Sequence, residues 1–428
     1  MRVQLKRNRS IRQALTAVTT ALVGVAPASS AGLNHSETSV LIYWERDRIR
    51  ATEAMFSVQK QMQNGDVLNL RFTYDGLTGA SPTGASPSKQ PQTLTRASGG
   101  STVLVKAGEL PIDNSFRETR FAFDADLTRG IVAGFTVGGG LHVSSEHDYK
   151  SIGLSASITK DLDSARTSIG LALSVLRDVN SPIGGIPTPF ASTDAAPERE
   201  NGRLVSHDNG HKNAYDAVLS LTRVLGPNLL ARFSYNVNYA EGYLTDPYKV
   251  ISVVQPPDSV DPGEPVLALY ENRPGSRTAN ALSCDLRTFR LGMAIETEYR
   301  FFWDDWGIRS HTAYASVNLG LKRAGSIRPH LRWYRQSRAN FSRPFLVQGV
   351  PMPEFVSADS RLAKFSAINA GLAYTVPTSP SSRLTFAIEW YTQRGDRSPP
   401  ESFGPLLAFN LFPDLDAVMV RVGLSHDF

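Results

Sequence analysis

The stretch MAIETEYRFFWDDWGIRSHTAYASVNLGLK, residues 293–322, decides the fold class of this chain. An extended strand points successive side chains to opposite faces. The first half of the stretch therefore has an apolar face that carries Tyr299, Phe301 and Trp303, and a charged face that carries Glu296 and Arg300. After the turn at DDWG, residues 312–319 alternate in the same way. The stretch predicts a β-hairpin whose polar face meets water in a soluble sandwich but lines the lumen in a membrane barrel.

The first 31 residues have the layout of a secretory signal peptide. Five basic residues and no acid precede an apolar run at 14–26, and the small residues that follow offer cleavage after Ala31 or, alternatively, after Ala28. We expect residues 1–31 to be removed and residues 32–428 to form the barrel. The five basic charges equal the formal net charge of +5, so the mature chain is near neutral (5 − 5 = 0). The sequence pI of 9.2 is therefore no argument for a nucleic-acid partner.

The C-terminal end of the sequence has the pattern of a signal for barrel assembly. In DAVMVRVGLSHDF, Val418, Val420, Val422 and Leu424 share one face with Phe428. This alternation with a terminal phenylalanine resembles the signal that the barrel assembly machinery of Gram-negative bacteria reads. We therefore expect Phe428 to act as an assembly signal, and we expect the protein in the Gram-negative outer membrane.

Alternating runs recur along the whole chain and predict about sixteen strands. They lie at 37–46, 49–62, 66–76, 115–126, 131–144, 150–160, 165–178, 212–224, 228–241, 276–286, 290–303, 307–321, 326–337, 363–376, 382–394 and 417–428. Sixteen is an even number, as bacterial single-chain barrels require. No apolar run of about eighteen residues follows the signal, so the sequence predicts no transmembrane helix.

The connections between these strands alternate in length. Short turns are expected at 63–65, 127–130, 161–164, 225–227, 287–289, 322–325 and 377–381, and long loops at 77–114, 179–211, 242–275, 338–362 and 395–416. Outer-membrane barrels sort their connections in this way between two rims. We therefore predict an all-β fold: a transmembrane antiparallel β-barrel of about sixteen strands with short periplasmic turns and long extracellular loops.

Two groups of side chains follow from this topology. Aromatic residues near the outer ends of strands are expected to form an interfacial girdle: Trp44, Tyr74, Tyr239, Trp303, Trp333 and Trp390, with their neighbours Tyr43 and Tyr391. If the apolar face meets lipid, charged residues on the other face point into the lumen, where they set selectivity or brace the wall in pairs. These candidates are Arg71, Glu118, Arg120, Arg232, Glu296, Glu298, Arg300, Arg328, His330, Arg332, Glu389 and Arg421.

The sequence gives only weak indications of metal binding or catalysis. Rim carboxylates at Glu146, Asp148, Asp304 and Asp305 are candidates for a hard cation, although acids in turns are more often simply solvated. The single cysteine, Cys284, cannot form an internal disulfide. His142 with Ser144, or His147 with Asp148, supplies residue types found in hydrolases but no motif. The sequence therefore predicts no catalytic residue, no cofactor and no enzyme.

Several separated segments resemble one protein family. They are residues 77–87 (LTGASPTGASP), 144–151 (SSEHDYKS), 242–249 (GYLTDPYK), 270–277 (YENRPGSR) and 303–312 (WDDWGIRSHT). The chain is similar here to the uncharacterised family of proteobacterial outer-membrane barrels known as domain of unknown function 3570. The resemblance implies an outer-membrane barrel and transfers no substrate or catalytic residue.

The leading functional prediction is a passive pore or transport-related channel with a charged lumen. One alternative is a closed structural or scaffold barrel whose long loops bind a partner, such as an envelope redox or secretion component. An outer-membrane hydrolase is the third reading. The expected partners are outer-membrane lipid, lipopolysaccharide and the barrel assembly machinery, with an unidentified periplasmic or extracellular protein as a further possibility and no nucleic acid.

Overall fold

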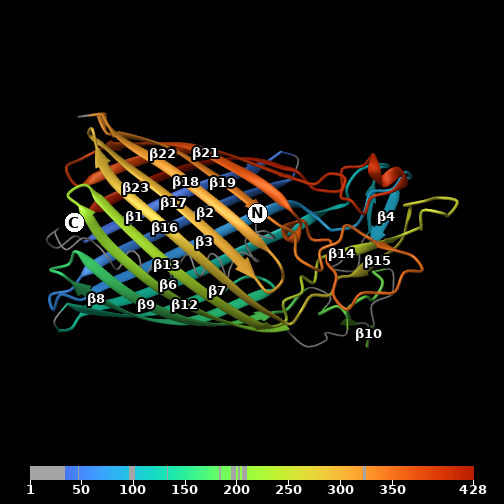
Figure 1. Ribbon diagram of the computed structural model, residues 1–428, viewed down its shortest axis with the longest axis horizontal. Helices are drawn as coiled ribbons and strands as arrows, with labels where there is room; N and C mark the ends of the chain where they lie inside the picture. Colours follow the sequence, from blue (N-terminus) through green and yellow to red (C-terminus); the bar gives the residue numbers. More distant parts are fainter. Residues whose placement is uncertain are drawn as a thin grey trace.

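The computed structural model describes residues 34–46, 48–95, 102–132, 134–182, 185–193, 199–200, 203–204, 210–321 and 324–428. Sixteen antiparallel strands form a closed barrel, because β1 pairs with both β2 and β23 (Figure 1). In ring order they are β1 (His35–Glu45), β2 (Ile49–Gln61), β3 (Val67–Pro82), β6 (Ile112–Gly130), β7 (Phe135–Ser145), β8 (Tyr149–Leu162), β9 (Thr167–Asn180), β12 (Gly210–Gly226), β13 (Leu229–Gly242), β16 (Ser276–Arg290), β17 (Met293–Asp304), β18 (Arg309–Gly320), β19 (Ser326–Gln336), β21 (Phe365–Pro377), β22 (Ser382–Gly395) and β23 (Leu415–Asp427). Among the described residues, no helix is long and apolar enough to cross a membrane.

The predicted fold class is confirmed, and each of the sixteen predicted strands has one counterpart in the barrel. Two predicted turns were misplaced. Residues 287–289 continue β16, which pairs with β17 as far as Arg290, and the turn falls at Leu291 and Gly292, both with positive φ. Residues 127–130 continue β6, so the next turn lies before Phe135. The predicted signal peptide, residues 1–31, lies outside the described residues.

The barrel wall has an apolar outer surface. Large hydrophobic side chains are exposed at every second position of its strands, for example Ile388 and Trp390 on β22 and Val420 and Val422 on β23. The positions between them carry polar or small residues that point into the barrel. This alternation is that of a membrane-spanning barrel whose outer surface meets lipid.

The outer surface gives a first testable prediction. Ile388 is 54% exposed on the lipid-facing side of β22, so Ile388→Arg should reduce the free energy of unfolding in lipid vesicles by about 2–4 kcal/mol. Thr385→Arg, on the inward face of the same strand, should cost substantially less. Urea unfolding of both variants measures the difference, and equal costs would contradict the assigned faces.

The aromatic residues expected at the outer interface do not all face the same way. Trp44, Tyr74, Tyr239, Trp333 and Trp390 are exposed on the outer surface, and Trp303 is half-buried beside the Tyr235 ring. Tyr43 is buried, and both Tyr43 and Tyr391 point into the barrel, where they pack in a hydrophobic cluster near its mouth. The expectation for these two was wrong, because each is adjacent to an outward tryptophan and neighbouring strand residues point to opposite faces.

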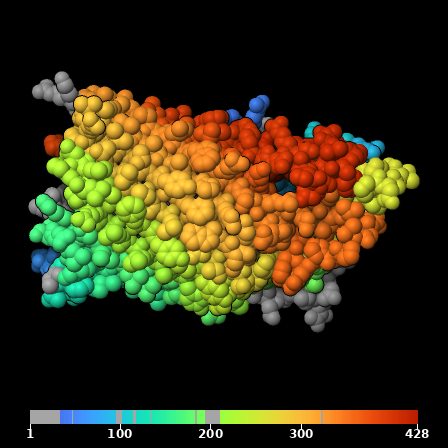
Figure 2. Space-filling model, viewed as in Figure 1, coloured from blue at the N-terminus to red at the C-terminus, as the bar shows by residue number. Residues whose placement is uncertain are grey.

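The long loops fold into a compact cap at one end of the barrel. They carry β4 (Gln92–Thr95), β5 (Thr102–Val105), β10 (Arg199–Glu200), β11 (Arg203–Leu204), β14 (Val250–Val254), β15 (Pro265–Tyr270) and β20 (Leu346–Val347), with 3-10 turns at Ser360–Leu362 and Gly404–Leu407. Strands from two different loops join in the sheet β15-β14-β20. In Figure 1 this sheet lies beyond the right-hand rim of the barrel, and Figure 2 shows the orange and red loop segments packed against each other there.

The cap has its own hydrophobic core. Ile251, Leu269 and Val356 form one buried cluster, and Val254, Phe345 and Leu406 form another. These residues come from three separate loops, so burial of their apolar surface joins the loops to one another.

Candidate functional site

The inward face of the barrel wall holds the charged residues singled out in the sequence. Arg332, for example, lies between Leu331 and Trp333, both exposed on the outer surface. By the same alternation Arg71 points inward from β3, Glu118 and Arg120 from β6, Arg232 from β13, Glu296, Glu298 and Arg300 from β17, Arg328, His330 and Arg332 from β19, Glu389 from β22, and Arg421 from β23.

Some of these charges are paired across neighbouring strands. Arg232 Nε donates to Asp285 Oδ2 at 3.3 Å, and the Arg287 guanidinium lies 2.7 Å from Glu296 Oε1. The register places each pair directly opposite, on β13 and β16 and on β16 and β17. Sequence reasoning missed Asp285 and Arg287, because the partner of a strand residue is known only once the register is known.

Other predicted residues are held by short networks. Arg120 donates to Asp75. His330 Nε2 lies 3.1 Å from Asn369 Oδ1, and Asn369 Nδ2 donates to Glu389 Oε2 at 3.1 Å. Asn369, which the sequence did not single out, therefore links β19 to β22 through β21.

Four arginines on one side of the lumen have no carboxylate partner. Arg300, Arg328, Arg332 and Arg421 form no ion pair with any residue that the structure describes. They lie on β17, β19 and β23. Glu298 and Glu389 lie on the same wall, so the four arginines leave the wall from β17 to β23 with a net positive charge.

The lumen wall at β6 carries the carboxylates Asp124 and Asp126. Asp124 Oδ1 lies 2.6 Å from His142 Nδ1 on the adjacent strand. β6 is fourth and β18 twelfth in the ring of sixteen, so this pair lies across the barrel from the arginines of β17 and β19. Asp126 lies beside this pair and packs against Gly140. Any side chain at position 140 would clash with the Asp126 carboxylate, because an added Cβ atom would lie only 2.3 Å from Asp126 Oδ1. This part of the wall therefore carries a cluster of carboxylates, although Arg71 faces Asp124 in register.

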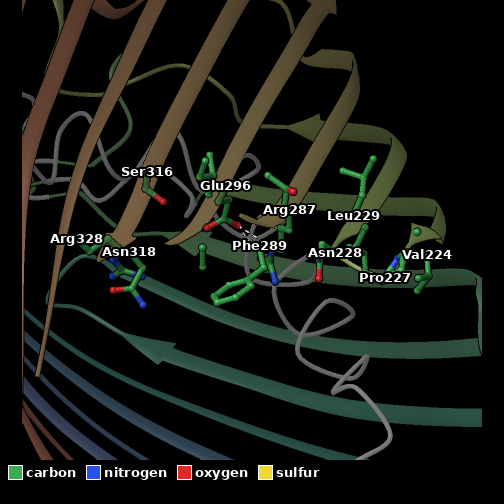
Figure 3. A pocket seen from close by; sticks show the side chains of 15 residues that line it. Val224, Pro227, Asn228, Leu229, Arg287, Phe289, Glu296, Ser316, Asn318 and Arg328 are labelled. Atoms are coloured by element: carbon green, nitrogen blue, oxygen red, sulfur yellow. Dashed lines mark hydrogen bonds and ion pairs between the residues drawn. The ribbon is translucent and has the colours of Figure 1, made fainter. Parts of the chain in front are cut away.

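A cavity of 620 Å³ occupies the lumen near the short-turn end (Figure 3). Arg287 and Glu296 lie in the middle of its wall, and Ser316, Asn318 and Arg328 gather on one side. Polar and apolar side chains both line it, and the charged residues Arg287, Glu296 and Arg328 are among them. The cavity therefore forms a vestibule of a size that accepts a small solute.

At the other end, the loop cap crosses the barrel mouth. Val250 N–H donates to the carbonyl of Thr83 at 3.0 Å, and Ser86 N–H donates to Ser252 Oγ at 2.9 Å. These loops leave β3 and β13, which are third and ninth in the ring of sixteen. Loops that start so far apart can only meet by passing over the lumen.

The cap contains a buried ionic network. The Arg273 guanidinium contacts Glu271 and lies 2.8 Å from Asp359 Oδ2, and all three side chains are at most 1% exposed. Arg361 also contacts Asp359 and lies 2.5 Å from Asp246 Oδ2. The network ties residues 246–273 to residues 359–361 across more than eighty residues of sequence.

The network shifts the titration of its members. Burial alone would raise the pKa of Asp246, but the charges of Arg361 and Lys249 hold that pKa below its usual range. Burial, together with the Arg361 charge, lowers the pKa of Lys249, whose ammonium donates to the carbonyl of Pro82. Asp246 therefore stays ionised in mild acid, and the cap remains closed by its charge pairs.

The family described as a protein of unknown function (DUF3570) matches residues 12–426. The chain belongs to this family. A search of curated proteins found no match.

Several solved structures are similar to this DUF3570 protein. The outer membrane protein opdK from Pseudomonas aeruginosa is 9% identical, with 93% of this chain and 99% of that chain covered and a TM-score of 0.41. The CymD monoaromatic hydrocarbon channel is 9% identical, with 99% and 93% covered and a TM-score of 0.40. A mutant ferric enterobactin receptor (PfeA) from Pseudomonas aeruginosa is 10% identical, with 85% and 54% covered and a TM-score of 0.42. At these identities and TM-scores, the likenesses transfer no function to the DUF3570 barrel.

The four rim carboxylates do not form one group in the DUF3570 barrel. Glu146 and Asp148 are buried with Glu118, and each offers an oxygen within 4.8 Å of the others, an arrangement that suits a hard divalent cation. Asp304 instead accepts from Arg277 and from Ile308 N–H, and Asp305 accepts from Thr278 N–H at 2.8 Å. These two acids stabilise the turn after β17, which explains their position without a metal.

The hydrolase residue types do not assemble into a catalytic pair. His142 is bonded to Asp124, and Ser144 Oγ, buried in the wall, has no hydrogen-bond partner among the described residues. Asp148 accepts from Tyr248 Oη at 2.8 Å, and in the described part of the chain no hydrogen bond joins it to His147. A serine nucleophile needs a base within hydrogen-bond reach, so this wall offers no such pair.

The low pKa of Asp246 predicts acid sensitivity of the cap. A carboxylate whose pKa is lowered by folding stabilises the folded state above its unfolded pKa of about 3.9 and loses that contribution as pH falls further. Hydrogen exchange of residues 243–275, corrected for intrinsic rates, should therefore rise as pH is lowered below about 4. Asp246→Asn should weaken the cap at pH 7 and flatten this dependence; an unchanged pH profile in the variant would contradict the assignment.

Proposed function

We propose that this chain is a passive pore of the Gram-negative outer membrane, exported by a cleaved signal peptide and closed or restricted at its outer mouth by the loop cap. The observation that carries the proposal is the row of unpaired arginines inside the barrel. An unpaired charge in a dry, apolar space costs several kcal/mol. Arg328 and Arg332 are exposed inside the wall, which supports a lumen filled with water through which solutes pass.

The excess of arginines on the wall from β17 to β23 supports selectivity as a property of the pore. Four arginines that make no ion pair with the described residues lie on β17 to β23, where they outnumber Glu298 and Glu389. Rings or rows of fixed charge in a channel attract counter-ions and repel ions of like sign. We therefore propose that small anions pass the arginine wall more readily than cations.

A second candidate function is favoured by the cap. Its loops cross the mouth and share a buried ionic network and two hydrophobic clusters. A stable cap of this kind also suits a closed scaffold barrel whose outer surface binds lipopolysaccharide or a protein partner. The two functions differ in whether ions cross the membrane.

Conductance of the refolded mature chain in a planar bilayer tests the proposed pore. We expect discrete conductance steps in KCl and a higher permeability for chloride than for potassium. The control for folding is that the unheated barrel keeps its folded mobility in SDS gel electrophoresis. Loss of chloride preference in the Arg328→Ala, Arg332→Ala double variant would support a pore lined by these residues. A folded barrel that never conducts would favour the scaffold.

A further inference from the structure

We propose that Arg300 and Arg332 form a binding site for a small organic carboxylate that carries a flat ring, of the benzoate class. The inference rests on the proposed pore function, since the site lies inside the lumen. It names a solute class that these two arginines of the wall recognise, beyond the attraction of the whole wall for anions in general.

The register brings the two arginines together with aromatic side chains. Arg332 on β19 faces Tyr314 on β18, and Tyr314 faces Glu298 on β17. One row further toward the outer mouth, Arg300 faces Thr312, which in turn faces Tyr334. Both rows belong to the inward face, so two guanidinium groups flank two tyrosines on three adjacent strands.

Neither arginine makes an ion pair with the residues that the structure describes. Arg332 is exposed within the barrel and makes no ion pair with any described residue, and the nearest residue on β21, Asn369, is engaged by His330 and Glu389. Arg300 is half-buried, with its guanidinium 5.8 Å from the centre of the Phe302 ring. The one acid in these two rows is Glu298, so the rows together carry a net positive charge.

The tyrosines supply a flat apolar surface and a free donor. Tyr334 Oη donates to Gln336 at 2.6 Å, which fixes its ring, and the ring also packs at 5.5 Å from Phe365. The Tyr314 ring lies 6.0 Å from His330, and its hydroxyl makes no hydrogen bond to the described residues. Such rings favour stacking on another planar ring.

These groups together select for a particular chemistry. A guanidinium presents two parallel N–H donors that match a carboxylate, and this charge-assisted pair is stronger than a neutral hydrogen bond. A ring attached to the carboxylate reaches the tyrosines on the neighbouring strand. A small inorganic anion would use the charge but not the rings, and an organic cation would be repelled by the arginines.

Titration calorimetry of the refolded barrel with benzoate tests the site. Benzoate should bind, whereas acetate and benzyl alcohol, which lack the ring and the charge respectively, should bind more weakly. Arg332→Gln should weaken benzoate binding about tenfold or more, as loss of a charge-assisted hydrogen bond predicts. Tyr314→Leu should weaken benzoate without changing acetate.

Arg421→Gln is the matched control. Arg421 is an unpaired lumen arginine on the same wall, but its neighbours in register are Ala387 and Leu41. Its replacement removes the same charge from a place where neither neighbour in register is aromatic, and it should leave benzoate affinity within about twofold, since no hydrogen bond to the ligand is lost. Equal losses in Arg332→Gln and Arg421→Gln would overturn the site and leave only a diffuse positive potential.

Conductance separates this inference from the pore itself. A barrel that conducts KCl but does not bind benzoate would overturn the site and leave the pore standing. A barrel that binds benzoate through Arg332 but never conducts would support the site and contradict the proposed pore function. Each variant is first checked for a folded, SDS-resistant barrel, so loss of binding is not confused with misfolding.

Discussion

Arg273→Met is expected to loosen the loop cap while the barrel stays folded. The Arg273 side chain is fully buried and pairs with Glu271 and Asp359, which are equally buried. Its removal takes the Arg273 cation from Glu271, whereas Asp359 keeps its contact with Arg361. Breaking a buried pair in this way costs about 3–5 kcal/mol. Limited proteolysis should cut residues 243–275 and 337–364 in the variant much faster than in the unchanged protein.

Arg338→Met is the control for this experiment. Arg338 pairs with Glu401 at the surface of the cap, where its side chain is 48% exposed. An exposed pair of this kind contributes at most about 1 kcal/mol, so cleavage of the cap should hardly change. Equal protection of the cap in the Arg273 and Arg338 variants would show that the buried network does not hold the loops together.

Reversing the charge of the arginine wall is expected to reverse the selectivity of the pore. The triple variant Arg328→Glu, Arg332→Glu, Arg421→Glu replaces three unpaired positive charges with three negative ones. Fixed charge in a cleft changes local counter-ion concentration by about tenfold or more. The ratio of chloride to potassium permeability, from reversal potentials in a KCl gradient, should therefore fall at least about tenfold.

Arg166→Glu is the control for the triple variant. Arg166 is exposed in the short turn between β8 and β9, outside the lumen wall. Its reversal should change the permeability ratio little, because exposed charges beyond a Debye length of about 8 Å are screened at physiological salt. An unchanged ratio in the triple variant would mean that the ions do not pass along this wall.

Much of the barrel follows from residues that are close in sequence. The alternation in residues 293–303 reports which face of β17 meets lipid, because a strand has period two. The sorting of short turns and long loops likewise follows from the spacing of such runs. The turn after β16 is the exception: Leu291 adopts a positive φ of 54°, which is uncommon for a branched side chain and gives no signal in the sequence.

The partners within the site could not be predicted. Asp285 and Arg287 match Arg232 and Glu296 only through the register of three strands. The contact between Arg361 and Asp246 spans 115 positions of sequence, and it depends on loops that meet over the mouth. The sequence therefore indicates which charges point inward, whereas the fold determines which remain unpaired.

The most direct test of the proposed pore compares single-channel conductance of the unchanged mature chain with that of Arg273→Met. Both proteins are refolded, checked for SDS resistance and inserted in planar bilayers in KCl. The account predicts discrete chloride-preferring steps in both, with longer open times or larger steps once the cap is loosened. Two folded barrels that remain equally silent would contradict the pore and leave a closed scaffold.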